Sequence, residues 1–347
     1  MKKLSSYVQE VKRNESNSIL NKQGGDPMIS QELVIETESL SKSFGDVHAL
    51  KSLSLKVPKN SIFGFLGPNG AGKTTTIKLL LGLSNATAGG GKVFGSEIDG
   101  ESIEIRKKVG YLAQDPVFYD HMTARQTLRH KLGFFYNGPK DLIEERITET
   151  LELVGLDDKA DRPIKGFSGG ERQRLGIALA QVTYPELLIL DEPAANLDPM
   201  GRRDVLAIME KLRKHATIFY STHILDDVQK VSDTVAILNH GELVAQAPIE
   251  ELLSGTTSMV YNVTIEGDYE EVHKIVIDQS WVSGIETLER NGHAKWLITV
   301  ADEDKAETEL LRLLMSVYGI KVTEFARNKV DLEEVFMRIV EDSNNGI

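Results

Sequence analysis

The stretch that decides the fold is "SIFGFLGPNGAGKTTTIKLLLGL", residues 61–83. A short apolar run precedes a segment of the form G-x-x-x-x-G-K-T, and an apolar segment with helical spacing follows it. Glycines let backbone N–H groups turn toward an anion at the start of a helix. This order of strand, loop and helix predicts a phosphate-binding loop. A glycine-rich loop that holds no nucleotide is the alternative.

We expect the whole loop to contact a nucleotide. Lys73 can reach the β and γ phosphates, and the Thr74 hydroxyl can ligate Mg²⁺. The expected contact residues are Gly67, Pro68, Asn69, Gly70, Ala71, Gly72, Lys73, Thr74 and Thr75.

A second motif, "LLILDEP" at residues 187–193, places two carboxylates at the end of an apolar run. Asp191, at the end of a buried strand beside the phosphate loop, can bind Mg²⁺ or its water shell. Glu192 lies on the opposite face of the strand and can polarise a water for attack on the γ-phosphate. An acidic strand end that faces solvent is the alternative, and the phosphate loop makes it the weaker interpretation.

A third motif, "FSGGERQRL" at residues 167–175, places a serine and two glycines just before an expected helix start. Exposed N–H groups at a helix start form an anion site. The sequence therefore predicts a second phosphate cradle about a hundred residues after the first.

The chain divides by pattern and composition. From 33 to about 248, short β-branched runs alternate with helical segments, and several runs are apolar on both faces. This predicts an α/β domain over 33–250 with a largely parallel core sheet. The strand signal disappears over about 115–168, which predicts a helical subdomain. Strand and helix patterns over 255–347 predict a small α+β domain, compatible with the order βαββαβ, that serves interaction or regulation.

Residues 1–28 are predicted to be a disordered tail, because they are polar and weakly periodic. The codons for Gln-Gly-Gly-Asp-Pro can spell a purine-rich ribosome-binding sequence just before Met28. We therefore hypothesise that translation begins at Met28. Mass spectrometry of the native N-terminus tests this, and abundant peptides from residues 1–27 would contradict it.

Composition limits the location and the partners. The 347 residues include no cysteine, no apolar run long enough to span a membrane and no signal-peptide core. We therefore expect a cytoplasmic protein that is not by itself a membrane protein. The formal net charge of -12 argues against general nucleic-acid binding, which needs clustered Lys and Arg.

Residues 33–248 resemble the ATP-binding subunits of ABC transporters. The three motifs are similar to that family's Walker A, Walker B and signature sequences. "YLAQDP" (111–116), "NLDP" (196–199) and "YSTH" (220–223) are similar to its Q-loop, D-loop and switch segment. The resemblance is closest to bacterial exporter ATPases with a separate permease, whose C-terminal extension often ends like "DLEEVFMRIV" (331–340).

The resemblance implies further roles. Phe44 would stack on adenine, and Gln114 would contact Mg²⁺ and the attacking water. His223 would bind the γ-phosphate and hold Glu192, and Asp198 would belong to the nucleotide site. Taken alone, a core phenylalanine, a surface glutamine and a structural histidine are the alternatives.

The implied protein is an ATPase with the P-loop NTPase fold that binds ATP and Mg²⁺, with Lys73 among its catalytic residues. It would pair head to tail with a second copy or a similar ATPase, so that Ser168, Gly169 and Gly170 close on the partner's nucleotide. The dimer would drive a separate transmembrane permease, for export, at the inner face of the cell membrane. The cargo is selected by the permease and is not encoded in this chain.

Four positions depart from the family's usual residues. Glu171 stands in place of Gln, Phe167 in place of Leu, Asn196 in place of Gly and Gln126 in place of Glu. Asn is the non-glycine residue best suited to a left-handed conformation, so we expect an intact D-loop. Gln126 puts the permease contact in doubt.

Two other functions are alternatives: a soluble ATPase that acts on DNA or ribosomes, and a regulator that binds nucleotide without hydrolysing it. Relatives that act on DNA carry a long coiled coil, and those that act on ribosomes usually carry two cassettes. This chain shows one cassette and no long heptad run. A regulator that no longer hydrolyses ATP would not need Lys73, Asp191, Glu192 and His223 together.

Overall fold

The computed structural model describes residues 32–98, 103–254, 259–290, 293–328, 332–333 and 336–337. The predicted tail and Met28 lie outside these residues. Contacts within the chain divide it between Pro248 and Ile249 into two units. Each unit is described by itself.

The first unit contains a six-stranded sheet in the order β11-β10-β4-β9-β8-β7. All neighbouring strands are parallel except β10 and β11. β4, β8 and β9 are buried along their whole length, which explains why they are apolar on both faces. The bounds are β4 (Ile62–Leu66), β7 (Val109–Leu112), β8 (Leu187–Asp191), β9 (Thr217–Thr222), β10 (Thr234–Asn239) and β11 (Glu242–Pro248).

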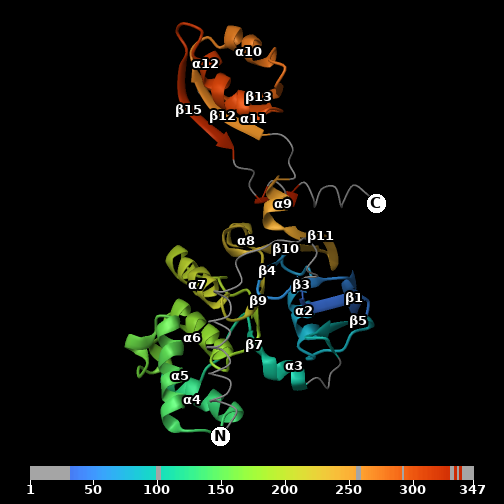
Figure 1. Ribbon diagram of the computed structural model, residues 1–347, viewed down its shortest axis with the longest axis vertical. Helices are drawn as coiled ribbons and strands as arrows, with labels where there is room; N and C mark the ends of the chain where they lie inside the picture. Colours follow the sequence, from blue (N-terminus) through green and yellow to red (C-terminus); the bar gives the residue numbers. More distant parts are fainter. Residues whose placement is uncertain are drawn as a thin grey trace, which may run out of the picture. The chain divides into compact units, whose positions relative to one another are not determined.

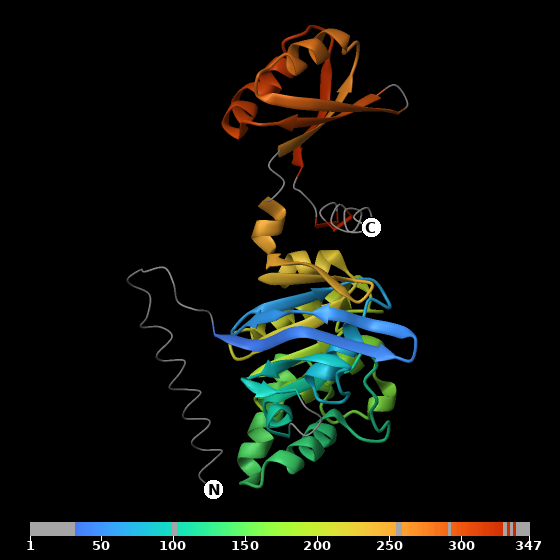
Figure 2. The same ribbon diagram turned by 90° about the vertical axis from the view of Figure 1, so that its right-hand side faces the viewer.

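A second, antiparallel sheet is drawn in blue in Figures 1 and 2. It has the order β2-β1-β5-β6, with β3 paired to β1. Its buried side chains, such as Val57, form one core with Phe63 and Phe65 of β4 and Ile77 of α2. Its strands are β1 (Leu33–Phe44), β2 (Val47–Leu53), β3 (Lys56–Pro58), β5 (Ala88–Val93) and β6 (Ser96–Glu97).

Helices complete the first unit. Between β7 and β8 the described chain forms α4, α5, two short 3₁₀ turns and α6, so the helical insertion is confirmed. No described helix has both the length and the apolarity needed to cross a membrane. The helices are α2 (Lys73–Leu80), α3 (Ile103–Lys108), α4 (Ala124–Phe135), α5 (Lys140–Leu153), α6 (Gly169–Gln181), α7 (Pro199–Leu212) and α8 (Leu225–Val231).

The second unit begins with α9 (Ile249–Ser254) and has its own core. Its antiparallel sheet has the order β13-β14-β12-β15. Val263 and Trp296 on one face of the sheet belong to a buried cluster with Val276 of α10 and Leu314 of α12. The elements run in the order β12 (Met259–Glu266), α10 (Glu270–Ile277), β13 (Val282–Arg290), β14 (His293–Val300), α11 (Glu303–Lys305), a π-helical turn (Ala306–Leu310), α12 (Leu311–Leu314) and β15 (Lys321–Asn328). The predicted fold class, an α/β P-loop ATPase domain with a small α+β domain, is confirmed.

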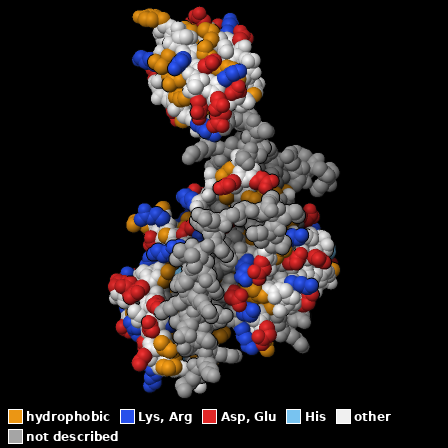
Figure 3. All heavy atoms as spheres, in the orientation of Figure 1, with side chains coloured by type: hydrophobic (Ala, Val, Ile, Leu, Met, Phe, Trp, Pro, Cys, Tyr) orange, Lys and Arg blue, Asp and Glu red, His pale blue; other side chains and the backbone are white. Residues whose placement is uncertain are grey.

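The surface carries charges of both signs. On the face drawn in Figure 3, Lys and Arg side chains alternate with Asp and Glu side chains. Among the described residues, exposed ion pairs join Lys51 to Glu242 and Lys59 to Glu32. On that face, the negative net charge is therefore spread over a mixed surface rather than gathered in one patch.

Candidate active site

The phosphate loop joins β4 to α2. A Cβ at Gly67 would collide with the carbonyl oxygen of Leu238, and one at Gly72 would lie 2.6 Å from the carbonyl oxygen of Ala49. Gly72 also has a φ of 107°, in the left-handed region. No side chain caps α2, so the N–H groups of its first turn can receive an anion.

Lys73 and Glu192 form a buried ion pair in which Nζ lies 3.2 Å from Oε1. Lys73 Nζ also donates to the carbonyl oxygens of Gly67, at 2.6 Å, and Pro68, at 3.1 Å. The other Glu192 oxygen, Oε2, lies 3.0 Å from Nδ1 of His223. His223 is 43% exposed, and no described residue contacts its other ring nitrogen. One carboxylate thus joins the phosphate loop to the switch histidine.

Two oxygen ligands suited to a metal lie on these elements. Asp191 is almost fully buried, and its Oδ1 accepts a hydrogen bond from the Ser221 hydroxyl at 2.5 Å. Its Oδ2 and the Thr74 hydroxyl have no hydrogen-bond partner among the described residues. The described chain holds no cluster of three or more acidic, His or Cys ligands. Because Mg²⁺ takes one or two protein oxygens together with substrate phosphates, this donor set fits Mg²⁺ rather than a metal caged by protein alone.

The Q-loop lies at the next strand. Gln114 is exposed in the bend after β7, and Leu112 of β7 pairs in register with Leu190 of β8. Gln114 and Asp191 therefore follow adjacent parallel strands, although no hydrogen bond of the described residues involves the Gln114 side chain. Burial raises the pKa of the neighbouring Tyr111, and the charge of Asp191 adds to this rise, which keeps the phenol neutral.

Phe44 ends β1 with its side chain 56% exposed, so it is not a core residue. The Nζ atom of Lys42 lies 4.9 Å from the centroid of its ring. An exposed aromatic ring at a strand end can stack on a base. The alternative of a core phenylalanine is excluded by this exposure.

Ser168 caps α6. Its Oγ accepts from the N–H of Glu171 at 3.2 Å, and Glu171 Oε2 accepts from the N–H of Ser168 at 2.8 Å. Glu171 Oε1 lies 2.9 Å from Nζ of Lys159. Burial acts to raise the pKa of Glu171, but hydrogen bonds from Lys159 and Ser168 outweigh it and hold the pKa below its usual value. The Ser168 hydroxyl uses only its acceptor role here, so its proton remains available to a ligand.

The D-loop leads from β8 into α7. Asn196 has a φ of 59°, the left-handed conformation considered for this position. Asp198 caps α7, where its Oδ1 accepts from the N–H of Gly201 at 2.7 Å.

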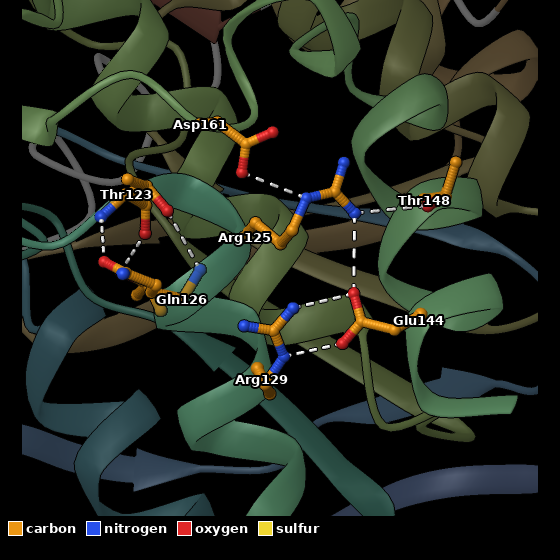
Figure 4. A network of polar contacts seen from close by, with 8 residues as sticks. Thr123, Arg125, Gln126, Arg129, Glu144, Thr148 and Asp161 are labelled. Atoms are coloured by element: carbon orange, nitrogen blue, oxygen red, sulfur yellow. Dashed lines mark hydrogen bonds and ion pairs between the residues drawn. The ribbon is translucent and has the colours of Figure 1, made fainter. Parts of the chain in front are cut away.

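Gln126 belongs to a capping box at the start of α4 (Figure 4). Its Oε1 accepts from the N–H of Thr123 at 2.9 Å, and its own N–H donates to the Thr123 hydroxyl. Beside it, Arg129 forms a two-bond contact with Glu144 that links α4 to α5 (Figure 4). The glutamine thus stabilises its own helix.

The structure brings together only part of the predicted set. Because β4, β8 and β9 are neighbours, Lys73, Glu192 and His223 meet at one edge of the sheet. No hydrogen bond or ion pair of the described residues joins Phe44 or residues 168–170 to these three.

Two contacts were not foreseen from the sequence. Ser221, inside the quoted "YSTH", binds both Asp191 and the N–H of Glu192. The sequence signal for Ser221 was a hydroxyl near the end of an expected strand, just before His223. Lys159 gave no signal, because its contact with Glu171 depends on how the helical insertion folds back.

Comparisons with known proteins identify the family. The ABC transporter family pattern matches residues 50–195. An uncharacterised ABC transporter ATP-binding protein, YxlF of Bacillus subtilis (strain 168), is 36% identical over 307 residues, covering 88% of this chain and 99% of YxlF. The bacitracin transport ATP-binding protein BcrA of Bacillus licheniformis is 33% identical over 309 residues, covering 88% and 97%. The solved structure of cbiO1 from Clostridium perfringens, part of the ABC transporter complex cbiONQ, is 26% identical with a TM-score of 0.60, covering 72% and 96%. The chain therefore belongs to the ABC transporter family, as an ATP-binding subunit and an ATPase.

Proposed function

We propose that this chain hydrolyses MgATP in head-to-tail pairs and powers a separate membrane permease, in the direction of export. One observation carries the catalytic part of the proposal. The Glu192 carboxylate contacts Lys73 with one oxygen and His223 with the other. A base held between the phosphate-binding lysine and the switch histidine is positioned for water attack on a γ-phosphate.

The residues divide the work of phosphoryl transfer. Lys73 and the N–H groups at the start of α2 bind the phosphates, and Phe44 stacks on the adenine. Thr74 and Asp191, with Gln114, would hold Mg²⁺, which neutralises charge on the β and γ oxygens when bound. Glu192 accepts a proton from the attacking water, whose oxygen forms the new bond to phosphorus as the bond to the ADP oxygen breaks. His223 orients Glu192 and contacts the γ-phosphate.

The need for a second subunit is inferred from α6. A Cβ built on Gly169 or Gly170 meets no atom within 4 Å, and neither residue has a positive φ. Nothing in the described chain therefore requires glycine at these positions. An approaching phosphate on a partner molecule would require it, together with the free proton of Ser168. On this proposal Asp198 lies in the same closed dimer.

The names of the relatives support a permease partner, and the resemblance to bacterial exporter ATPases supports the direction of export. BcrA is named for bacitracin transport and matches this chain over nearly its whole length. We therefore place the ATPase at the inner face of the cell membrane, bound to a permease. The cargo follows from the permease, and a neighbouring gene that encodes about six apolar spans would support this arrangement.

The central test replaces Glu192 with Gln. The variant keeps the shape of the side chain but cannot accept a proton, so it should bind ATP, lose nearly all turnover and accumulate as an ATP-bound dimer. Steady-state hydrolysis and light scattering with ATP measure both effects. Unchanged hydrolysis would remove Glu192 as the base.

A second variant tests the composite site. Gly169→Val adds bulk where the partner's phosphate would lie, so hydrolysis should fall while the monomer still binds ATP. Loss of binding by the monomer would mean that residues 168–170 serve the nucleotide of their own subunit.

A further inference from the structure

Ser221 lies at the point where the catalytic strands meet. It is fully buried near the end of β9 and pairs in register with Asp191 of β8. Its hydroxyl donates to Asp191 Oδ1 at 2.5 Å and accepts from the N–H of Glu192 at 3.0 Å. The same N–H lies 3.2 Å from the Ser221 carbonyl oxygen. A single hydroxyl therefore binds both acidic residues of the site.

The contact with Asp191 fixes how this carboxylate is turned. A buried carboxylate needs a donor, and the Ser221 hydroxyl supplies one to Oδ1. Oδ2 is left without a partner among the described residues. The bond thus leaves one oxygen free for a metal ion or its water.

The contact with Glu192 supports a strained backbone. Glu192 has a φ of 48°, a left-handed conformation that is unfavourable for a non-glycine residue. Such residues persist only where the surroundings hold them. Here the buried N–H of Glu192 is satisfied by Ser221 alone among the described residues.

The residues after Ser221 continue the connection. The carbonyl oxygen of Thr222 accepts from the N–H of Gly67, the first residue of the phosphate loop, at 3.2 Å. His223 contacts Glu192. Three consecutive residues of β9 and its exit therefore reach the phosphate loop, the metal-site aspartate and the base.

We propose that Ser221 is a positioning residue for ATP hydrolysis, which holds the Asp191 carboxylate toward the metal and the Glu192 backbone in its catalytic conformation. This inference rests on the roles proposed above for Asp191 and Glu192. Without the hydroxyl, Asp191 can rotate, and the Glu192 N–H keeps only the 3.2 Å contact with the Ser221 carbonyl oxygen. Phosphate binding by Lys73 and α2 does not depend on either change.

The test compares Ser221→Ala with Thr217→Val. Thr217 is also fully buried on β9, and its hydroxyl accepts from the N–H of Asn60 at 2.8 Å, at the other end of the strand. Both variants lose a buried hydroxyl, so urea unfolding of each shows whether their free energies of unfolding fall by similar amounts. Ser221→Ala should lower kcat about 10- to 100-fold with little change in KM for ATP, as a misplaced reacting group does. Thr217→Val should keep kcat.

A binding measurement provides a readout that is independent of turnover. Calorimetry of the full chain should give unchanged affinity of Ser221→Ala for ADP without metal, but a smaller gain in affinity on adding Mg²⁺ than in wild type. Ser221→Cys, which keeps the size and a weak donor, should lie between the two and serves if the alanine variant does not fold.

Two results would overturn the inference. One is a kcat equal to that of Thr217→Val, and the other is a wild-type response to Mg²⁺. Either result, with Glu192→Gln still inactive, would reject the role of Ser221 and leave the proposed function standing. Normal turnover in Glu192→Gln would instead reject the function itself.

Discussion

At the scale of single residues, the site depends on backbone conformations that most side chains avoid. Glu192 and Asn196, at the exit of β8, have φ values of 48° and 59°. A left-handed residue bends the chain sharply, which helps to connect a buried strand to α7 in few residues. Asn accepts this conformation at lower cost than other non-glycine residues, whereas Glu192 is held in it by Ser221.

The conformation of Asn196 gives a prediction of stability. Asn196 is exposed, so substitution changes little packing. Asn196→Val should destabilise the first unit by about 1–2 kcal/mol, because a β-branched side chain strains a positive φ. Asn196→Gly, the control, should stay within about 0.5 kcal/mol of wild type. Urea unfolding followed by far-UV circular dichroism measures both, and a valine variant as stable as wild type would contradict the conformation.

At the scale of elements, two helices begin with the same device. Thr123 and Gln126 cap α4, and Ser168 and Glu171 cap α6 (Figure 4 shows the first). The unusual residues Gln126 and Glu171 both fit these capping boxes, since Gln and Glu each supply the side-chain oxygen that the capping box requires. Only Glu171 brings a charge, and Lys159 neutralises it.

The pair of Lys159 and Glu171 predicts a rescue. Lys159→Ala would leave a negative charge at the helix start where a partner's γ-phosphate is proposed to bind, so ATP-driven dimerisation and kcat should fall several-fold. Adding Glu171→Gln removes that charge and should restore both. Lys165→Ala, on the next 3₁₀ turn, is the control for loss of an exposed lysine. A double variant no better than Lys159→Ala would show that charge is not the cause.

The lowered pKa of Glu171 predicts a pH dependence of stability. A carboxylate with a lowered folded-state pKa stabilises the fold above its ordinary value, here 4.5, and this contribution is lost as pH falls through the folded-state pKa. Wild type should therefore exceed Glu171→Gln in unfolding free energy at neutral pH, and the difference should vanish in acid. Urea unfolding at several pH values measures it. Glu145→Gln, at an exposed position of α5, is the control for the removal of one carboxylate.

At the scale of the whole molecule, the chain consists of two units with separate cores. The residues proposed to bind the nucleotide all lie in the first unit. Both tryptophans of the sequence, Trp281 and Trp296, are buried in the second. Tryptophan fluorescence therefore reports on the second unit, which holds none of the residues proposed to bind ATP.

This division predicts a selective effect of ligand. A ligand at 100 times its dissociation constant stabilises the state that binds it by about 2.7 kcal/mol. MgATP added to Glu192→Gln should raise the temperature at which the first unit unfolds, seen as one transition in far-UV circular dichroism. The unfolding temperature of the second unit, followed by tryptophan fluorescence, should not change. An equal shift of both signals would show that the two units unfold as one.

Much of the fold is determined by the sequence alone. The segments of β4, β8 and β9 are short and largely apolar on both faces, as is typical of strands covered on both sides. The phosphate loop could be predicted because its glycines are required locally, by the contact of Gly67 with Leu238 and the positive φ of Gly72.

The site was determined by the sequence in its residue types and by the tertiary structure in its contacts. Lys73, Asp191, Glu192 and His223 could be named because each belongs to a motif at the end of a strand or at the helix start that follows it. Segments far apart in the chain determine which oxygen of Glu192 meets Lys73 and which meets His223. They also determine the exposure of Phe44 and the bonds of Ser221 and Lys159. The residues of a motif are close together in the sequence, so a motif can be recognised without the fold. These contacts, in contrast, arise only when β8 and β9 pair in register and the helical insertion folds back on α6.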